Sequence, residues 1–308
     1  MNLLKKSAFV AVVGRPSSGK STLVNFICGA KVAITSVVPQ TTRNAIRGIL
    51  NKEDGQLVFV DTPGRHTSEK KLNKKLIEVS DRALVDSELI LYVLDASRPP
   101  GPEEIAIAKR LLPFSSRTIA AINKMDIPQA DYKGVLEFLK EEMPDLPASN
   151  CFAISALKKE GVDALLSALY AMAPSGDPMY PDDIYTDQEI SFRIAEIIRE
   201  KAMNRLREEL PHSIYVEIAD AELRDDIAPD REKSPSGKRL WVRAFIIAER
   251  ESQKGMIVGK GGEMIKAIRL SALKDLKQIF EWKIDLDLRV KTGKDWRHND
   301  KVLRRLIT

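Results

Sequence analysis

The chain has 308 residues, so two domains of roughly 180 and 120 residues are the first expectation. Its apolar share of 44% and charged share of 30% are those of an ordinary globular protein, and no apolar run approaches the ~20 residues of a membrane span. Two cysteines, Cys28 and Cys151, without metal-ligand spacing around either, argue against a disulfide framework or a zinc site and fit a reducing cytoplasm.

The net charge is unevenly distributed along the chain. Residues 1–187 hold 23 basic and 23 acidic side chains, whereas residues 188–308 hold 26 and 21 and so carry the whole excess of +5. Such an excess also fits a solvated surface, but its position favours the C-terminal part as the part that binds a polyanion.

The N-terminus superficially resembles a secretion signal, because two lysines precede an apolar stretch. The apolar run from Ala8 to Val13 is short, however, lacks a cleavage site and leads directly into a glycine-rich turn. It therefore predicts a buried strand.

From Phe9 to about Ala173, short apolar runs alternate with amphipathic stretches. Helices are expected at residues 20–27 and 103–112, and five strands at AFVAVVG, QLVFVD, LILYVLDA, RTIAAIN and CFAIS. This alternation predicts an α/β domain with a mostly parallel sheet and helices on both faces. Ligands bind such sheets beyond the carboxyl ends of the strands, where the polar motifs of this sequence also stand.

The first of these motifs, GRPSSGKS at residues 14–21, matches GxxxxGK[ST] between a predicted strand and a predicted helix. Backbone N–H groups of such a loop surround phosphates, the lysine neutralises the β and γ groups, and the serine ligates Mg²⁺. A plain strand-to-helix turn is the alternative. The expected phosphate-binding residues are Gly14, Ser17, Ser18, Gly19, Lys20, Ser21 and Thr22.

The second motif, DTPG at residues 61–64, ends the QLVFV strand. A carboxylate at Asp61 can hold Mg²⁺ through water, and the amide of Gly64 can reach the γ-phosphate. Taken alone the tetrapeptide is also an ordinary turn, so its position downstream of the phosphate loop carries the prediction.

The third motif, NKMD, follows the RTIAAI strand and predicts specificity for guanine. The carboxylate of Asp126 would accept hydrogen bonds from N1–H and the exocyclic amine, and adenine would leave it desolvated and unpaired. Lys124 would lie along the base, and Asn123 would tie this loop to the phosphate loop. After the fifth strand, Ser155, Ala156 and Leu157 complete the base pocket, with a backbone N–H, that of Ala156, directed at guanine O6.

The C-terminal part has a different pattern. Residues 174–187, PSGDPMYPDDIYTD, are rich in proline and acids and predict a linker between residues 1–173 and 188–308. A helix is expected from Gln188 to Leu210, followed by strands at residues 213–218 and 240–247, a GKGG loop, a helix at about residues 263–280 and a strand at residues 283–290.

The GKGG loop contains GxxG between two helical segments, which predicts RNA binding. A loop without bulky side chains can approach an RNA backbone closely, and basic neighbours neutralise phosphates; a simple tight turn is the alternative. The candidate RNA-binding residues are Lys254, Ile257, Gly259, Lys260, Gly261, Gly262, Lys266 and Arg269.

The four nucleotide motifs stand in the order found in translation-factor-like GTPases. The segment PQTTR at residues 39–43 resembles the first switch of Era and tRNA-modification GTPases, which implies that Thr42, with Thr41 as the alternative, ligates Mg²⁺ when GTP is bound. The catalytic set implied is Lys20, Gly64 and Thr42, and the metal set is Ser21, Thr42 and Asp61.

The segments EIIREK (196–201) and RESQKGMIVGKGG (250–262), with the order helix-strand-strand-helix-helix-strand, extend the resemblance to the Era family. The resemblance covers nearly the whole chain and implies an α/β P-loop GTPase domain followed by a smaller α+β type II KH domain. It further implies GTP, GDP and Mg²⁺ as ligands. The implied partners are the 3′ end of 16S ribosomal RNA and the 30S subunit during its maturation, with loose attachment to the inner face of the membrane and a monomeric, cytoplasmic protein.

Two positions depart from relatives. Arg65 follows DTPG where Ras-like enzymes have a water-positioning Gln, so it is either an exposed side chain or a phosphate contact supplied in cis. Ser17 stands where many potassium-using relatives have Asn, which argues against a K⁺ cofactor.

Three alternatives remain at this point. One is an RNA-binding protein that binds GTP without turnover, which the missing Gln keeps open. The others are a tRNA-modification GTPase, for which no reactive cysteine or additional domain is found, and an ATP-using phosphotransferase, which would leave NKMD unexplained.

Overall fold

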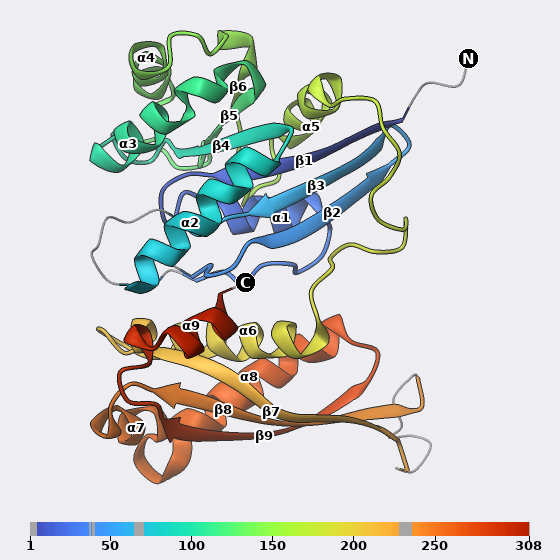
Figure 1. The fold of residues 1–308 in the computed structure, drawn as a ribbon, viewed down its shortest axis with the longest axis vertical. Helices are drawn as coiled ribbons and strands as arrows, with labels where there is room; N and C mark the ends of the chain where they lie inside the picture. The colour runs from blue at the N-terminus through green and yellow to red at the C-terminus, as the bar shows by residue number, and fades with distance from the viewer. Residues whose placement is uncertain (1–4, 37, 39–40, 65–70, 228–235, 308) are drawn as a thin grey trace. The chain divides into compact units, whose positions relative to one another are not determined.

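The computed structural model describes residues 5–36, 38, 41–64, 71–227 and 236–307 (Figure 1). These residues form two compact units. Unit 1 comprises Met1–Thr35, Pro39–Asp187 and Arg305–Thr308, and unit 2 comprises Ser36–Val38 and Gln188–Arg304. No helix among the described residues is both long enough and apolar enough to cross a bilayer.

Unit 1 is built on a six-stranded sheet in the order β2-β3-β1-β4-β5-β6, in which only β2 runs antiparallel to its neighbour. The strands are β1 (Lys6–Val13), β2 (Ile46–Lys52), β3 (Gly55–Asp61), β4 (Leu89–Asp95), β5 (Thr118–Asn123) and β6 (Cys151–Ala153). The helices are α1 (Lys20–Ile27), α2 (Lys71–Asp86), α3 (Pro102–Leu111), α4 (Tyr132–Glu142) and α5 (Val162–Met172), with short 3₁₀ turns η1 (Leu112–Arg117) and η2 (Ala148–Asn150).

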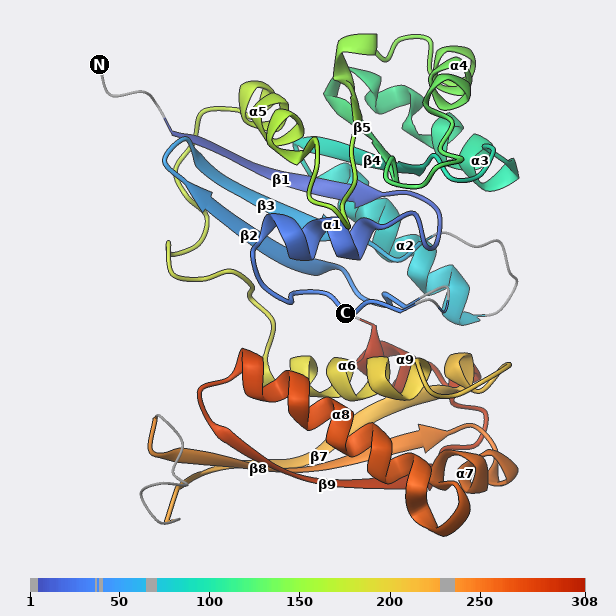
Figure 2. The same cartoon turned by 180° about the vertical axis from the view of Figure 1, so that it is seen from behind.

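Alternating side chains of the strands supply two cores, one on each face of this sheet. Val10 and Val12 pack with residues of α1 and α5, whereas Ala11 and Val13 pack with residues of α2, α3 and α4. Figure 1 shows α2 in front of the sheet, and Figure 2 shows α1 and α5 on the opposite face. Because both faces are covered, β3, β4 and β5 are buried along their whole length, as expected for continuous apolar runs.

The antiparallel strand β2 was not among the five predicted strands. Its sequence, IRGILNK, contains a glycine and three polar residues, and it lies at the edge of the sheet, where one side is only partly covered. Gly48 is the position where β2 passes α1, since an added Cβ would lie 2.7 Å from Cys28 Sγ. Propensity is least informative at such an edge.

Residues 174–187 are attached to unit 1 rather than extending freely from it (Figure 1). Ser7 N–H donates to Pro174 O at 3.0 Å, Gln56 bonds the backbone of residues 179 and 180, and Ile49 N–H donates to Tyr185 O at 2.9 Å. We call these residues the strap. The proline-rich composition indicated the lack of regular structure, but it carried no signal for these bonds, which are made by side chains and backbone of β1, β2 and β3.

Unit 2 is a three-stranded sheet in the order β7-β8-β9, with β7 and β8 antiparallel and β8 and β9 parallel. Its core lies between the sheet and the helices α6 and α8. The elements are α6 (Ile190–Met203), η3 (Pro211–Ser213), β7 (Ile214–Asp225), β8 (Lys238–Ala248), α7 (Glu251–Val258), η5 (Lys260–Gly262), α8 (Glu263–Ile279), β9 (Lys283–Thr292), η6 (Trp296–His298) and α9 (Asp300–Leu306), of which the part up to Arg304 belongs to unit 2.

The predicted element order of unit 2 is confirmed, but two bounds differ by seven residues, whereas the others differ by two at most. The first helix ends at Met203 instead of Leu210, and Glu208, with a φ of 56°, has a backbone conformation that no helix contains. The first strand is longer than predicted and continues to Asp225 through an irregularity between Ile218 and Asp220. A bulge shifts the period-2 pattern, so the second half of this strand does not read as a continuation of the first.

Candidate functional site

The phosphate loop joins β1 to α1, and its two glycines have no room for a side chain. A Cβ on Gly14 would lie 2.3 Å from Val93 O, and one on Gly19 would lie 2.2 Å from Asn123 Nδ2. Their φ values of 153° and 102° also favour glycine. The GxxxxG spacing therefore follows from close approach to β4 and to the NKMD loop. Of the predicted residues between them, Ser17 is exposed and Ser18 is fully buried.

Lys20 is buried at the start of α1. Its ammonium donates to Gly14 O and Arg15 O, both at 2.9 Å, so it lies across the loop that it follows. Burial lowers the pKa of Lys20 to about 8, against the opposing attraction of Asp61 and Glu103. A polyphosphate in the loop would supply the negative charge that favours the protonated ammonium.

Three oxygens predicted as metal ligands lie together. Ser21 Oγ donates to Asp61 Oδ2 at 2.6 Å and lies 3.2 Å from Thr42 Oγ1, which is 3.4 Å from the same carboxylate oxygen. They come from α1, from the segment before β2 and from the end of β3, so the fold brings together positions 21, 42 and 61. The hydroxyl of Thr42, the first choice for the threonine ligand, therefore lies within this group of oxygens.

The same cluster fits a hard divalent cation. Burial raises the pKa of Asp61, opposed by Lys20 and by the hydroxyls of Ser21 and Thr42. Asp61 Oδ1 has no hydrogen-bond partner among the described residues, although the carboxyl is completely buried. Hydroxyl and carboxylate oxygens are the ligands Mg²⁺ prefers, and a cation there would remove the desolvation penalty of the carboxylate.

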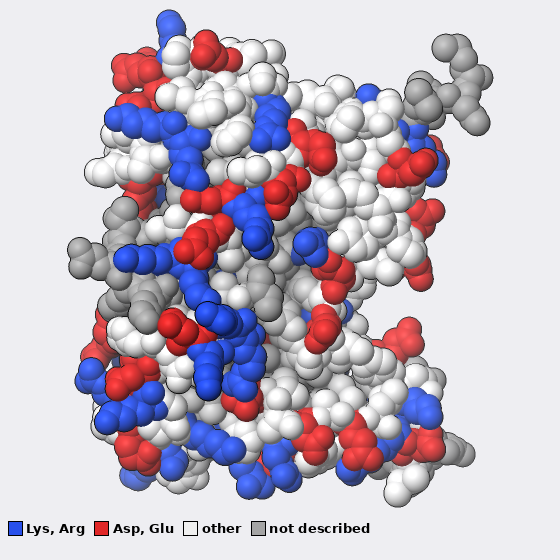
Figure 3. Space-filling model, in the orientation of Figure 1, with Lys and Arg blue, Asp and Glu red and all other residues white. Residues whose placement is uncertain are grey.

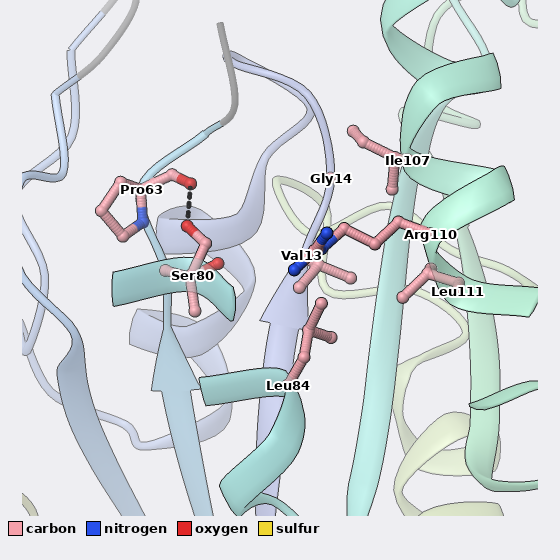
Figure 4. Close-up of a pocket in the computed structure, with 9 residues that line it drawn as sticks. Val13, Gly14, Pro63, Ser80, Leu84, Ile107, Arg110 and Leu111 are labelled. Carbon is pink, nitrogen blue, oxygen red and sulfur yellow. Dashed lines mark hydrogen bonds between the residues drawn. The ribbon is translucent and has the colours of Figure 1, made fainter. Parts of the chain in front are cut away.

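The DTPG segment lies beside a small cavity between α2 and α3 (Figure 4). Ser80 Oγ donates to Pro63 O at 3.0 Å, and this bond is drawn in the figure. A Cβ on Gly64 would lie 3.0 Å from Pro16, so this glycine closes against the phosphate loop. The hydrogen bond ties Pro63 of the segment to α2. Arg65, for which two alternatives were left open, lies outside the described residues, as do Pro39 and Gln40 of the PQTTR segment.

Asn123 joins the two loops expected to bind the base, NKMD and residues 155–157, to the phosphate loop, as predicted from NKMD. Its Nδ2 donates to Ser18 O at 2.8 Å, and its Oδ1 accepts from Ala156 N–H at 2.9 Å. The second bond differs from the expectation that the Ala156 N–H faces guanine O6, because here that N–H already has an acceptor inside the protein. It would have to share or exchange this partner to meet a base.

The carboxylate predicted to select guanine, that of Asp126, is held by the last of the predicted loops. Ser155 Oγ donates to Asp126 Oδ1 at 2.6 Å and accepts from Lys158 N–H at 3.0 Å. Ser155 is buried, whereas Leu157 is 70% exposed and so lies on the surface beside the loop. Lys124, with a φ of 69°, turns its ammonium to Asp95 Oδ2 at 2.7 Å. Sequence reasoning had not singled out Asp95.

In unit 2, the GKGG loop between α7 and α8 is formed by glycines with left-handed backbone. Gly259, Gly261 and Gly262 have φ values of 76°, 60° and 82°. A Cβ on Gly259 would lie 2.7 Å from Met264 Cβ, whereas at Gly261 and Gly262 nothing lies within 4 Å. The first glycine is required by packing and the other two leave open space in front of the backbone.

The basic residues predicted around this loop are accessible, with one correction for an apolar one. Lys260 and Lys266 are exposed, Lys254 pairs with Glu251 at 3.2 Å, and Arg269 Nη1 donates to Leu286 O at 3.4 Å. Ile257 is fully buried in the core of unit 2, so it supports the loop and does not belong to its contact surface.

Two exposed apolar side chains were missed near the loop, Met256 at 60% and Leu270 at 51% exposure. Their helices, α7 and α8, flank GKGG. A further concentration of positive charge lies over α9 in Figure 3, where Lys301, Arg304 and Arg305 are exposed. The basic excess of the C-terminal part therefore includes its last helix.

Comparisons with known proteins agree with both halves of this description. A family model described as 50S ribosome-binding GTPase matches residues 9–124, and a KH domain model matches residues 209–297. The fold and the loops define a P-loop GTPase that carries a KH domain.

Full-length relatives make the assignment more specific. The GTPase Era of Treponema denticola is 46% identical over 300 residues, which are 97% of this chain and 99% of the relative. That of Borrelia garinii subsp. bavariensis is 44% identical over 302 residues, 98% of this chain and 99% of the relative. The chain belongs to the Era family of GTPases.

Solved structures extend the similarity to the fold of the whole chain. An Era crystal structure in complex with MgGDPNP and nucleotides 1506–1542 of 16S ribosomal RNA is 33% identical, with a TM-score of 0.89, and covers 97% of this chain and 98% of its own. A variant of Aquifex aeolicus Era bound to GDP·AlF₄⁻ is also 33% identical, with a TM-score of 0.88 and the same coverage.

Proposed function

We propose that this protein is a GTP-hydrolysing switch that binds the 3′ end of 16S ribosomal RNA through its KH domain and acts in maturation of the 30S subunit. The observation that carries the proposal is the cluster of Ser21, Thr42 and Asp61 in one chain with the GKGG loop. Support comes from the similarity, over 97% of the chain, to an Era structure that holds both MgGDPNP and a 16S segment.

In the nucleotide site, Lys20 binds the β and γ phosphates and Asp126 selects guanine. Ser21, Thr42 and Asp61 would hold Mg²⁺, which when bound neutralises charge developing on the phosphates. Thr42 lies on the segment before β2 and Gly64 on the segment after β3, so both contact the phosphate end of the nucleotide. Gly64 contributes its backbone N–H to the transferred group, and the packing of Gly64 against Pro16 keeps this segment close to the phosphate loop.

In the KH domain, the open space before Gly261 and Gly262 lets an RNA backbone come close, and Lys254, Lys260, Lys266 and Arg269 neutralise its phosphates. Met256 and Leu270 provide apolar surface for bases beside the loop. GTP and RNA then act as two ligands of one switch, and each alters the affinity for the other.

The test is phosphate release from GTP and from ATP at matched Mg²⁺, in sodium or potassium, with and without an oligonucleotide of the 16S 3′ end. A scrambled oligonucleotide of the same composition is the control. Turnover of GTP alone, raised by the matching RNA, supports the proposal. Tight GTP binding without turnover in every condition would instead make the chain a GTP-binding RNA-binding protein, and equal use of ATP would overturn the guanine assignment.

The same proposal includes the finer expectations from the sequence. The domains comprise residues 1–173 and 188–308, joined by residues 174–187, and the protein is a cytoplasmic monomer with loose attachment to the inner face of the membrane and no requirement for K⁺. Light scattering tests the monomer, and flotation with anionic vesicles at low and physiological salt tests the attachment. Equal turnover in sodium and potassium supports the last point.

A further inference from the structure

Asp95 ends β4 beside both nucleotide loops and is a centre of charge that no nucleotide motif contains. Its side chain is fully buried. One oxygen, Oδ1, accepts from Ser97 N–H at 3.0 Å and from the Ser97 hydroxyl at 2.5 Å. The other, Oδ2, faces three cations: Lys124 Nζ at 2.7 Å, and Arg15 Nη2 and Arg98 Nη2, each at 3.4 Å. Both lone-pair regions of the carboxylate are therefore used within unit 1.

The shortest of these ion pairs involves the lysine of NKMD. Lys124 has a left-handed backbone, with a φ of 69°, and its side chain is 28% exposed. A lysine side chain has four rotatable bonds and loses up to about 2 kcal/mol of rotamer entropy when it is fixed. Because Asp95 holds the ammonium, the alkyl stem is already ordered in the loop that carries Asp126, where the base is expected to bind.

A second ion pair of Asp95, with Arg15, connects it to the phosphate loop. Arg15 follows Gly14, is buried, and also contacts Glu104 of α3, with Nε 2.6 Å from Oε1. Glu104 in turn accepts from Gly101 N–H at 3.1 Å at the start of α3. The base loop, the carboxyl end of β4, the phosphate loop and α3 are thus joined by a continuous set of charge contacts.

The charges of the cluster keep Asp95 ionised. Burial alone would raise the pKa of Asp95, but hydrogen bonds from Lys124 and Ser97 outweigh it and hold the pKa below its usual value. Substitution by a neutral residue of the same shape would leave the cluster with unbalanced positive charge. Arg15 would keep Glu104, whereas the described ion pairs give Lys124 no second carboxylate.

We propose that Asp95 is a positioning residue for guanine nucleotides, which acts by holding Lys124 in the orientation that packs against the base and by linking that lysine to the phosphate loop through Arg15. The proposal rests on the proposed guanine site. Its consequence is that the base site is ordered before nucleotide arrives, so that less side-chain entropy is lost on binding. Removing the carboxylate then weakens binding mainly through faster dissociation.

The experiment is a double-mutant cycle on the dissociation of a fluorescent GDP analogue from the full-length protein, with Asp95→Asn, Lys124→Met and the two combined. Lys124→Met retains the alkyl stem and removes the ammonium. We expect Asp95→Asn alone to speed dissociation about tenfold, and to change it less than twofold when Lys124→Met is already present. In GTP turnover, Asp95→Asn alone should raise KM about tenfold and change kcat less than twofold.

Asp163→Asn, an exposed acid in the first turn of α5, is the matched control and should leave dissociation unchanged. Circular dichroism and a thermal melt establish that each variant is folded. If Asp95→Asn accelerates dissociation equally in both backgrounds, Asp95 does not act through Lys124 and the inference is overturned. If Asp95→Asn does not unfold the protein and leaves dissociation as in the parent, it is overturned as well. A parent protein that does not bind GDP would contradict the guanine site itself, which is a separate outcome.

Should Asp95→Asn fail to fold, Arg15→Gln offers the second route, because it breaks the link to the phosphate loop and leaves the Asp95–Lys124 pair in place. The expected result is faster dissociation in the presence of Lys124 and a smaller effect with Lys124→Met. Equal effects in the two backgrounds would exclude the link.

Discussion

Gln56 and Tyr180 exchange a reciprocal pair of hydrogen bonds across a sequence separation of 124 residues: Gln56 Nε2 donates to Tyr180 O at 2.8 Å, and Gln56 Oε1 accepts from Tyr180 N–H at 2.9 Å. Gln56 is 1% exposed and also accepts from Met179 N–H at 2.7 Å. One buried amide therefore fixes the strap to β3.

We expect Gln56→Ala to release the strap. Loss of the amide leaves three partly buried backbone groups unpaired, which should lower the free energy of unfolding by about 2–3 kcal/mol in total. Hydrogen exchange at residues 179–185 should accelerate markedly, and the melting temperature of unit 1 should fall by several degrees. Gln129→Ala, on an exposed residue, is the control. Unchanged protection of the strap would show that its other contacts suffice.

Asp126→Asn should reverse the base preference. The NH2 group of the introduced amide would face one of the two donors of guanine, its exocyclic amine. Xanthine has a carbonyl oxygen in place of that amine and can accept the hydrogen bond. GTP affinity should fall roughly 100-fold and XTP affinity should rise. Competition binding against a fluorescent nucleotide measures both. Equal loss for both bases would mean that the substitution disturbed the Ser155 bond instead of the recognition.

Thr42→Ala should remove a metal ligand that is needed with GTP. Phosphate release should drop about 10- to 100-fold, since a hydroxyl that binds Mg²⁺ is lost. Thr42→Ser keeps the hydroxyl and should retain most of the turnover. Chelation of Mg²⁺ should bring parent and both variants to the same background rate. If Thr42→Ala turns over at the parent rate, Thr41 becomes the candidate ligand.

The GKGG loop allows a test with two side chains of equal size. Gly261 has a φ of 60° and open space before it, and Asn and Asp both tolerate this conformation. Gly261→Asp places a negative charge where RNA phosphates are expected, so RNA affinity should fall at least about tenfold more than with Gly261→Asn. Filter binding over a salt series measures it. Equal effects of the two variants would exclude close phosphate approach at this residue.

The cysteines should react slowly with thiol reagents. Burial raises the pKa of Cys28 to about 12 and also raises that of Cys151. Because only the thiolate reacts, labelling of Cys28 should rise about tenfold for each pH unit from 7 to 10. The folded state holds the thiol proton of Cys28 more tightly than the unfolded chain does. The stability that this proton contributes is therefore lost as the pH rises from about 9 to about 12. A labelling plateau near pH 9 would contradict the shift. Mass spectrometry of peptides containing each cysteine gives the rates.

Sequence reasoning worked where a motif and a strand end coincide. The order of strands placed Ser21 and Asp61 at one edge of the sheet, and the structure shows them 2.6 Å apart. It failed where a contact depends on residues that no local pattern connects. Asp95 and Gln56 each gain their partners from distant segments, Lys124 and Tyr180. In the sequence, a buried acid after an apolar run or a buried amide before one looks like any other turn residue.

The same distinction explains the other differences. β2 is an edge strand with polar positions, so its alternation is weak, and Ile257 reads as part of a loop motif although its side chain faces the core. Both require knowledge of what covers them, which is tertiary information.

The strap also bears on how this chain can be shortened. A fragment that stops at Ala173, directly after α5, would lack Tyr185, which accepts from Ile49 N–H, and Thr186, which donates to Arg47 O. In that fragment the edge of β2 would be exposed, and Gln56 would lack the backbone groups of the strap with which it forms hydrogen bonds. Exposed sheet edges pair readily with other chains. A fragment ending at Asp187 keeps that edge covered, so the choice of terminus would decide between a soluble preparation and one that self-associates.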